Sequence, residues 1–245
     1  MLRSSIAVGS LVFLGSLVYR AVAHGGVLDY KFGKVWYNGF VPYTSAVGQS
    51  SIQREWDQYD PITDVQDAAL SCNYNGAALN KQLSATVAAG TSVTAYWNPW
   101  PHTIGPVLVY MAQCPGSCTS ADTSALNWFK IDEAGLLSGD LATGEWGMGQ
   151  VVQNNNSWTS VIPASLQPGE YMIRHELIAI HVPEIPQFYP NCAQLKLTGS
   201  GKAVPTQTVK FPGGYSQTDP GLIVDIIADG DQTTYTIPGP SVFRG

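Results

Sequence analysis

The chain has 245 residues, of which only 12% are charged, and its formal net charge is −6. An acidic chain with few lysines lacks the basic surface that binds nucleic acid or an anionic membrane, so we expect neither partner. Its 25 glycines and 16 prolines favour turns and strands over long helices.

Residues 1–23 have the pattern of a secretory signal peptide. Arg3 supplies a positive start, residues 6–18 are mostly apolar, and Ala21-Val22-Ala23 forms an A-x-A cleavage site. A membrane-spanning helix is the alternative, but the segment is short and Arg20 interrupts it. We therefore predict a secreted protein, and we expect its mature chain, residues 24–245, to form a single domain and to be monomeric.

The remaining elements predict a β-rich domain. Residues 31–69 are polar, aromatic-rich and weakly periodic, which indicates a long loop with short strands. Residues 122–132 carry the one helical pattern. Short apolar or alternating runs, which predict strands, span residues 91–97, 107–112, 157–162, 169–180, 193–198 and 221–227. We predict an all-β, immunoglobulin-like or fibronectin-like antiparallel β-sandwich with long decorated loops.

Four cysteines in a secreted chain suggest two disulfide bonds. Cys114 and Cys118 flank a Pro-Gly-Ser turn that can bring them within reach, which leaves Cys72 to pair with Cys192. A metal site built from cysteines is the alternative, but an oxidising compartment disfavours it.

The one N-glycosylation sequon is Asn155-Asn156-Ser157. It lies in a polar turn before an expected strand, so we predict that Asn155 carries a glycan that faces solvent.

The chain has four histidines, and His24 becomes the first residue if the signal peptide is removed. The α-amino nitrogen and the ring Nδ1 of an N-terminal histidine can both bind one metal ion. A second imidazole would complete a planar set of three nitrogens, which suits Cu(II). A histidine can also stand at this position by chance, so the other motifs must decide.

His102, His175 and His181 occupy different settings. His102 lies in a loop with three prolines, which can present an imidazole at little cost in entropy. On a regular strand, alternation puts His175 on one face and Arg174 and Glu176 on the other, where these two can form an ion pair. His181 would lie roughly 20 Å from His175 along an extended strand. Both cannot serve one metal ion, and we interpret His181 as structural.

Gln187 and Tyr189 are two residues apart and share a face if the chain is extended there. A returning strand could place both beside His175, where a phenol, an amide and an imidazole would supply a weak axial ligand and hydrogen bonds to bound oxygen species. The alternative is ordinary strand packing.

Taken together, these motifs give the chain a resemblance to fungal lytic polysaccharide monooxygenases of auxiliary activity family 9. The resemblance rests on His24-Gly25 after a signal site, the His102 loop that ends in Gly-Pro-Val, Arg174-His175-Glu176, and Gln187-Phe188-Tyr189. Further motifs extend it over the whole mature length, including Thr218-Asp219-Pro220-Gly221 and the ending Tyr235-Thr236-Ile237-Pro238-Gly239-Pro240.

The resemblance implies one copper ion held by the amine and Nδ1 of His24 and by Nε2 of His102, with Tyr189 as the axial residue. It assigns His175 and Gln187 to hydrogen bonding near the oxygen site. The implied reaction uses O2 or H2O2 and an external electron donor to oxidise C1 or C4 of a β-1,4-linked glucan such as cellulose.

Two further positions follow from the same resemblance. Tyr215, and less strongly Tyr43, match tyrosines that stack on sugar rings; either could instead be a packed aromatic residue. The chain departs from the family's His-x-Gly-Pro motif, since Thr103 and Ile104 both separate His102 from Gly105.

Two other functions remain open at this point. A secreted glycoside hydrolase would need a positioned pair of carboxylates, and Glu176 is the one acidic residue inside a strong motif. A non-catalytic copper-binding or carbohydrate-binding protein could share the same sandwich.

Overall fold

The computed structural model describes residues 24–245, and the signal peptide predicted for residues 1–23 lies outside them. The helical elements are the α-helix α1 (Gly147–Gln153) and two single 3₁₀ turns, η1 (Ala68–Leu70) and η2 (Cys118–Ser120). The strands are β1 (Val27–Phe32), β2 (Val35–Asn38), β3 (Ala85–Ala88), β4 (Ser92–Trp97), β5 (Val107–Gln113), β6 (Phe129–Ala134), β7 (Leu136–Ser138), β8 (Glu145–Trp146), β9 (Ser157–Val161), β10 (Gly169–Ala179) and β11 (Gln187–Thr198).

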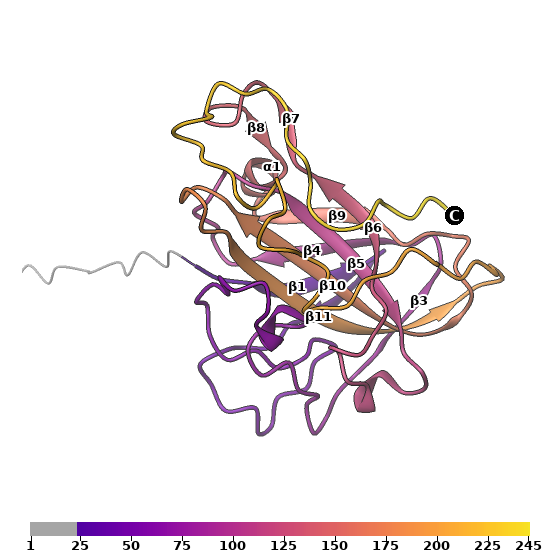
Figure 1. The fold of residues 1–245 in the computed structure, drawn as a ribbon. Coiled ribbons are helices and arrows are strands. Elements are labelled where there is room, and N and C mark those ends of the chain that lie inside the picture. Colours follow the sequence, from indigo (N-terminus) through magenta and orange to yellow (C-terminus); the bar gives the residue numbers. More distant parts are fainter. Residues whose placement is uncertain (1–23) are drawn as a thin grey trace, which may run out of the picture.

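Two sheets face each other and form a β-sandwich (Figure 1). One has the strand order β2-β1-β4-β9, the other the order β3-β11-β10-β5-β6, and β7 and β8 form a small separate ladder. The predicted fold class is confirmed. One pair departs from the antiparallel pattern, because β3 runs parallel to β11. Within residues 24–245, no helix is long and apolar enough to cross a membrane.

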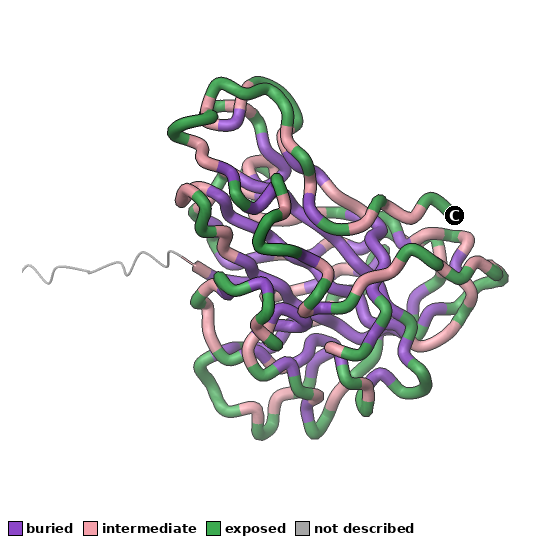
Figure 2. The backbone as a smooth tube through the Cα atoms, in the orientation of Figure 1, coloured by how far each residue is buried: buried purple, intermediate pink, exposed green. Residues whose placement is uncertain are grey.

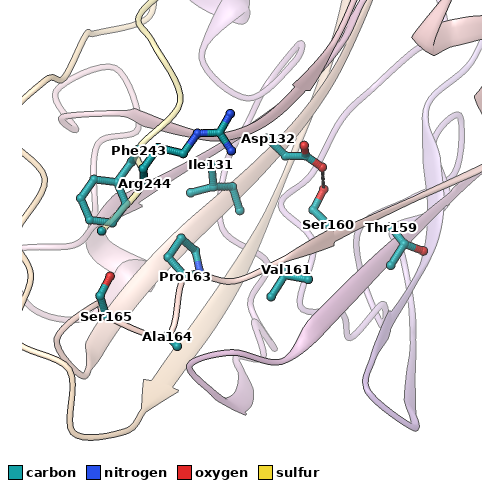
Figure 3. Close-up of a pocket in the computed structure, with 11 residues that line it drawn as sticks. Ile131, Asp132, Thr159, Ser160, Val161, Pro163, Ala164, Ser165, Phe243 and Arg244 are labelled. Carbon is teal, nitrogen blue, oxygen red and sulfur yellow. Dashed lines mark hydrogen bonds between the residues drawn. The ribbon is translucent and has the colours of Figure 1, made fainter. Parts of the chain in front are cut away.

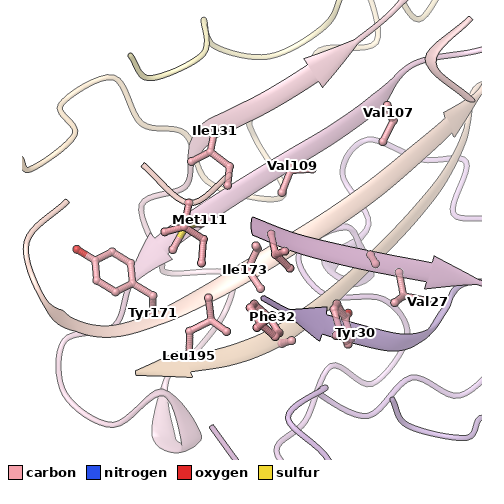
Figure 4. Packing of buried hydrophobic residues seen from close by; sticks show 14 of the residues in the cluster. Val27, Tyr30, Phe32, Val107, Val109, Met111, Ile131, Tyr171, Ile173 and Leu195 are labelled. Atoms are coloured by element: carbon pink, nitrogen blue, oxygen red, sulfur yellow. The ribbon is translucent and has the colours of Figure 1, made fainter. Parts of the chain in front are cut away.

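The main core lies between the two sheets. Inward-facing residues of β1 and β5, such as Tyr30, Phe32, Val109 and Met111, meet there and are almost fully buried (Figure 4). The pattern in β4 is a strict alternation of buried and less buried residues, as expected for a strand with one face in the core. This alternation made the β4 region recognisable from the sequence.

A second core covers the outer face of the five-stranded sheet. Leu108, Tyr110 and Ala112 of β5 point into it, so both faces of that strand are buried. Figure 2 shows the resulting band of buried backbone through the middle of the molecule. Burial on both faces explains why residues 107–112 form a continuous apolar run.

Two expected elements are wrong. Residues 122–132 are not helical: they form a turn followed by the start of β6. The Asp122 carboxylate accepts hydrogen bonds from the backbone and hydroxyl of Ser124, which competes with helix formation. Residues 221–227 are turns rather than a strand, because Asp219 and Asp225 accept hydrogen bonds from the backbone around them.

Both predicted disulfide bonds are confirmed. Cys72 is joined to Cys192, with 5.2 Å between their Cα atoms, and Cys114 is joined to Cys118. The longer bridge ties the loop after η1 to the middle of β11. It therefore fixes the loop that follows η1 against the outer face of the five-stranded sheet.

Asn155 lies in the turn between α1 and β9. It is exposed and has a φ of 57°, a left-handed conformation that asparagine tolerates better than most residues. Its glycosylation stays a prediction.

Candidate metal centre

Three segments bring His24, His102 and Tyr189 together at one end of the sandwich. His24 lies three residues before the start of β1, His102 lies in the loop between β4 and β5, and Tyr189 is in β11. The ring centre of His24 lies 6.0 Å from those of His102 and Tyr189, and the latter two are 6.5 Å apart. The three rings thus form a nearly equilateral triangle.

The spacing of the two imidazoles fits a shared metal ion. An imidazole nitrogen lies about 2 Å from a bound divalent metal, which puts the ring centre about 3 Å from the ion, so imidazoles on opposite sides of one ion have centres about 6 Å apart. Among residues 24–245, no three histidine, cysteine, aspartate or glutamate side chains converge as metal ligands. A third strong ligand at this site would have to be another kind of group, such as the α-amino nitrogen that His24 would have if residues 1–23 were removed.

The His102 loop is fastened at both ends. Asn156 accepts hydrogen bonds from the backbone of Trp97 and, through its side chain, from that of Trp100. At the other end a Cβ on Gly105 would lie 2.0 Å from the carbonyl oxygen of Ile178, so only glycine permits this approach to β10. The additional residue between His102 and Gly105 is accommodated without removing His102 from the site.

Tyr189 is 1% exposed, and its ring packs edge-on against Trp100 at 4.8 Å. Its hydroxyl donates a hydrogen bond of 2.8 Å to Oε1 of Gln187. Burial, with a smaller contribution from the charge of Asp60, raises the pKa of the Tyr189 phenol well above its ordinary value. Tyr189 is therefore a neutral phenol whose hydroxyl is oriented by its hydrogen bond to Gln187.

The structure exchanges the roles expected for His175 and His181. His175 lies in the core against Tyr30 and Trp97, and burial lowers its pKa to about 3. The ring of His181 instead stacks on His102, with 4.2 Å between centres and 17° between planes. The prediction that His175 sits beside Gln187 at the open site is therefore corrected. Ala179 is the residue of β10 that faces Gln187, and His175 lies four residue pairs further along the ladder, opposite Asn191.

Arg174 and Glu176 form the predicted ion pair on the opposite face of β10. Two hydrogen bonds of 2.7 and 2.6 Å join them, and both side chains are fully buried. The Arg174 guanidinium also donates to the carbonyl oxygens of Leu70 and Ser71 and lies 4.1 Å from the centre of the Phe211 ring.

The placement of Tyr215 on a substrate-binding surface is wrong. Tyr215 is 3% exposed, packs parallel to Phe188, and donates a hydrogen bond to Glu176. Its hydroxyl also lies 3.0 Å from that of Tyr110. These contacts with Phe188, Glu176 and Tyr110 bury the Tyr215 ring in the second core, so it cannot stack on a sugar.

Tyr43 does lie on the surface, with 66% of its area exposed and its ring edge-on to Tyr59. Asp60, the residue after Tyr59, places a carboxylate oxygen 3.9 Å from Nδ1 of His24. Sequence reasoning missed Asp60, Trp100 and His181 at this site. The signal for Trp100 was its position two residues before His102, but no pattern pointed to Asp60.

A cavity of about 590 Å³ lies elsewhere, at the edges of β6 and β9 beside the C-terminal residues (Figure 3). Its polar wall includes Asp132, whose carboxylate accepts hydrogen bonds from Trp158 and Ser160. None of the residues of the histidine site lines this cavity.

Comparison with known proteins gives consistent matches over nearly the whole described chain. The model of Auxiliary Activity family 9, formerly GH61, matches residues 24–235, and so begins at His24. AA9 family lytic polysaccharide monooxygenase B of Heterobasidion irregulare is 62% identical over 229 residues, which cover 92% of this chain and 94% of that protein. The crystal structure of HiLPMO9B, also 62% identical, superposes with a TM-score of 0.89 over 91% of this chain and 100% of that one. A cellulose-active polysaccharide monooxygenase from M. thermophila is 41% identical and superposes with a TM-score of 0.83 over 90% of this chain and 99% of that one.

Proposed function

The chain belongs to Auxiliary Activity family 9, a family of lytic polysaccharide monooxygenases that cleave polysaccharides oxidatively, and we propose that it is a secreted, copper-dependent member acting on β-1,4-linked glucan, with cellulose as substrate. The observation that carries the proposal is the triangle formed by the rings of His24, His102 and Tyr189 at the residue where the family match begins. In this proposal residues 1–23 are removed, so that His24 gains a free amine.

The residues present fit one copper ion. His24 would bind through its amine and Nδ1 and His102 through Nε2, and the Tyr189 phenol would add a weaker interaction with the ion. When bound, copper supplies the one-electron chemistry by which O2 or H2O2, together with an external electron donor, oxidises the C–H bond at C1 or C4 of the glucan.

The protein's own side chains control what surrounds the ion. Trp100 packs against both Tyr189 and His102, which excludes water from the inner side of the site. Oε1 of Gln187 accepts a hydrogen bond from the Tyr189 hydroxyl, which keeps the neutral phenol oriented. We assign to His181 the outer hydrogen-bonding role first given to His175, because its ring lies against His102.

The substrate would approach the exposed end of the sandwich. The side chain of His24 is 31% exposed. Tyr43 is an exposed aromatic residue whose backbone N–H donates to the carbonyl oxygen of Asp57 and whose ring lies edge-on to that of Tyr59. An exposed aromatic ring can stack on a sugar ring of a polysaccharide. We therefore retain Tyr43, and not Tyr215, as the sugar-stacking candidate.

The hydrolase alternative loses its one candidate acid. Glu176 is fully buried and is occupied by Arg174 and Tyr215, so it cannot protonate a glycosidic oxygen in solvent.

The decisive experiment is mass spectrometry of the products released from cellulose. With copper, ascorbate and oxygen, the chain beginning at His24 should release oligosaccharides oxidised at a terminal sugar, and a chelator should abolish them. Unmodified oligosaccharides that persist in the chelator would indicate hydrolysis. Copper binding without any product would indicate a non-catalytic protein, and either result would contradict the proposal.

A further inference from the structure

One side chain, Asn98, holds the backbone of the first three residues of the mature chain. Its Oδ1 accepts the N–H of Gly26 at 2.9 Å, and its Nδ2 donates to the carbonyl oxygen of His24 at 3.1 Å. Its backbone N–H donates to the carbonyl oxygen of Gly26 at 3.3 Å. Within residues 24–245, these are the hydrogen bonds that the structure gives to the backbone of residues 24–26.

The two glycines after His24 make this arrangement possible. A Cβ on Gly25 would lie 1.7 Å from Oδ1 of Asn98, so the amide occupies the space that any other side chain would need. A Cβ on Gly26 would lie 2.5 Å from Oδ1 of Asn191, which itself accepts the N–H of Val27. The side chains of two buried asparagines, Asn98 and Asn191, therefore make hydrogen bonds to the backbone of residues 24–27 that a neighbouring strand would otherwise make.

Asn98 also belongs to the loop that carries His102. It follows β4 directly and precedes His102 by four residues. The segment that bears the first imidazole and the loop that bears the second are thus joined through one amide, which is 6% exposed.

We propose that Asn98 is a positioning residue for the copper site, since its side-chain amide fixes the backbone of His24, and with it the α-amine, relative to His102. This inference rests on the proposed function. A terminal residue is attached to the chain on one side only, so the Nδ2 bond to its carbonyl oxygen helps to fix the peptide plane from which the Cα of His24, and with it the amine, extends. Preorganisation of this kind lowers the entropy lost on metal binding.

The test measures Cu(II) binding to the mature chain, with Cu(II) alone as the probe. Asn98→Ala should weaken the affinity by roughly 10-fold to 100-fold, as is usual when a group that orients a metal ligand is removed. It should also change the electron paramagnetic resonance spectrum of the bound Cu(II), because the position of the amine changes. The matched control is Asn127→Ala, the same substitution at an exposed residue, which should leave affinity and spectrum unchanged.

Gly25→Ala supplies an independent variant. Alone it should weaken Cu(II) binding, because its Cβ displaces the Asn98 amide. In the Asn98→Ala background the same change should cost little more, since the space is already empty. Thermal melting of each metal-free variant shows whether it is folded.

Three results would overturn the proposal. They are wild-type affinity and spectrum in a folded Asn98→Ala variant, fully additive losses in the double variant, and a Gly25→Ala variant that binds Cu(II) normally. If the wild-type mature chain itself fails to bind Cu(II) tightly, the proposed function fails and this inference falls with it.

Discussion

Glu176→Gln should destabilise the fold strongly without any direct effect on the histidine site. The carboxylate accepts two hydrogen bonds from Arg174 and one from Tyr215, and both charged side chains are fully buried. Glutamine keeps the size of the side chain but removes its charge, so the Arg174 guanidinium is left buried and uncompensated.

The size of the loss follows from this environment. Removing one partner of a buried ion pair costs about 3–5 kcal/mol. For a domain of this length each kcal/mol moves the melting temperature by about 2–4 °C, so we expect a decrease of roughly 6–20 °C. Glu145→Gln, the same change at an exposed glutamate of β8, should stay within about 0.5 kcal/mol of the wild type.

The measurement is urea unfolding of the metal-free wild type and both variants at one pH. Cu(II) affinity, measured well below the melting temperature, should be the same in all three. A loss in Glu176→Gln below about 1 kcal/mol would refute the assignment of this carboxylate as the counter-ion of a buried guanidinium.

Three other expectations concern stability and substrate. Burial lowers the pKa of His175 from 6.5 to about 3, so between these pH values the unfolded chain binds a proton that the folded chain does not. The free energy of unfolding therefore falls as the pH drops from 6.5 towards 3, by at most about 1.4 kcal/mol per pH unit from this group. Urea unfolding at pH 6.5 and 4.5 should show a smaller loss of stability in His175→Phe than in the wild type, and equal losses would contradict the argument. Replacing Cys72 and Cys192 by alanine should cost roughly 4–5 kcal/mol in the same assay, because the bridge closes a loop with a sequence separation of 120 residues; a loss under about 2 kcal/mol would contradict the chain-entropy account. Tyr43→Ala should weaken binding to cellulose about fivefold in a pull-down, with little change in melting temperature since the ring is exposed, and unchanged binding would remove Tyr43 from the substrate surface.

The parts of the fold that the sequence predicted correctly are those set by alternating apolar and polar residues or by contacts between residues close in the chain. Residues 91–97 alternate because β4 has one face in the core, and Cys114 and Cys118 can be paired because a short turn joins them. Arg174 and Glu176 share a face of one strand, so their ion pair required no knowledge of the tertiary fold.

The errors arose where distant segments decide the outcome. Tyr215 looks like a surface residue in its glycine-rich turn, but Glu176 and Phe188, from two strands, bury it. His181 could not be distinguished from a solvent-facing histidine, because only the path of the chain after β10 brings it onto His102. The hydrogen bonds from Asn98 to the backbone of His24 and Gly26 could not be predicted either, since they join residues more than 70 positions apart in the chain.

The role of the His24 amine is the central claim, and one extra residue tests it. Cu(II) affinity should be measured by calorimetry for the chain that begins at His24 and for the same chain with a single glycine before it. Because the glycine converts the amine into a peptide nitrogen, we predict binding at least about a hundredfold weaker, a loss of roughly 2.7 kcal/mol, and no oxidised products from cellulose. Equal affinity and equal activity in the two chains would contradict the account.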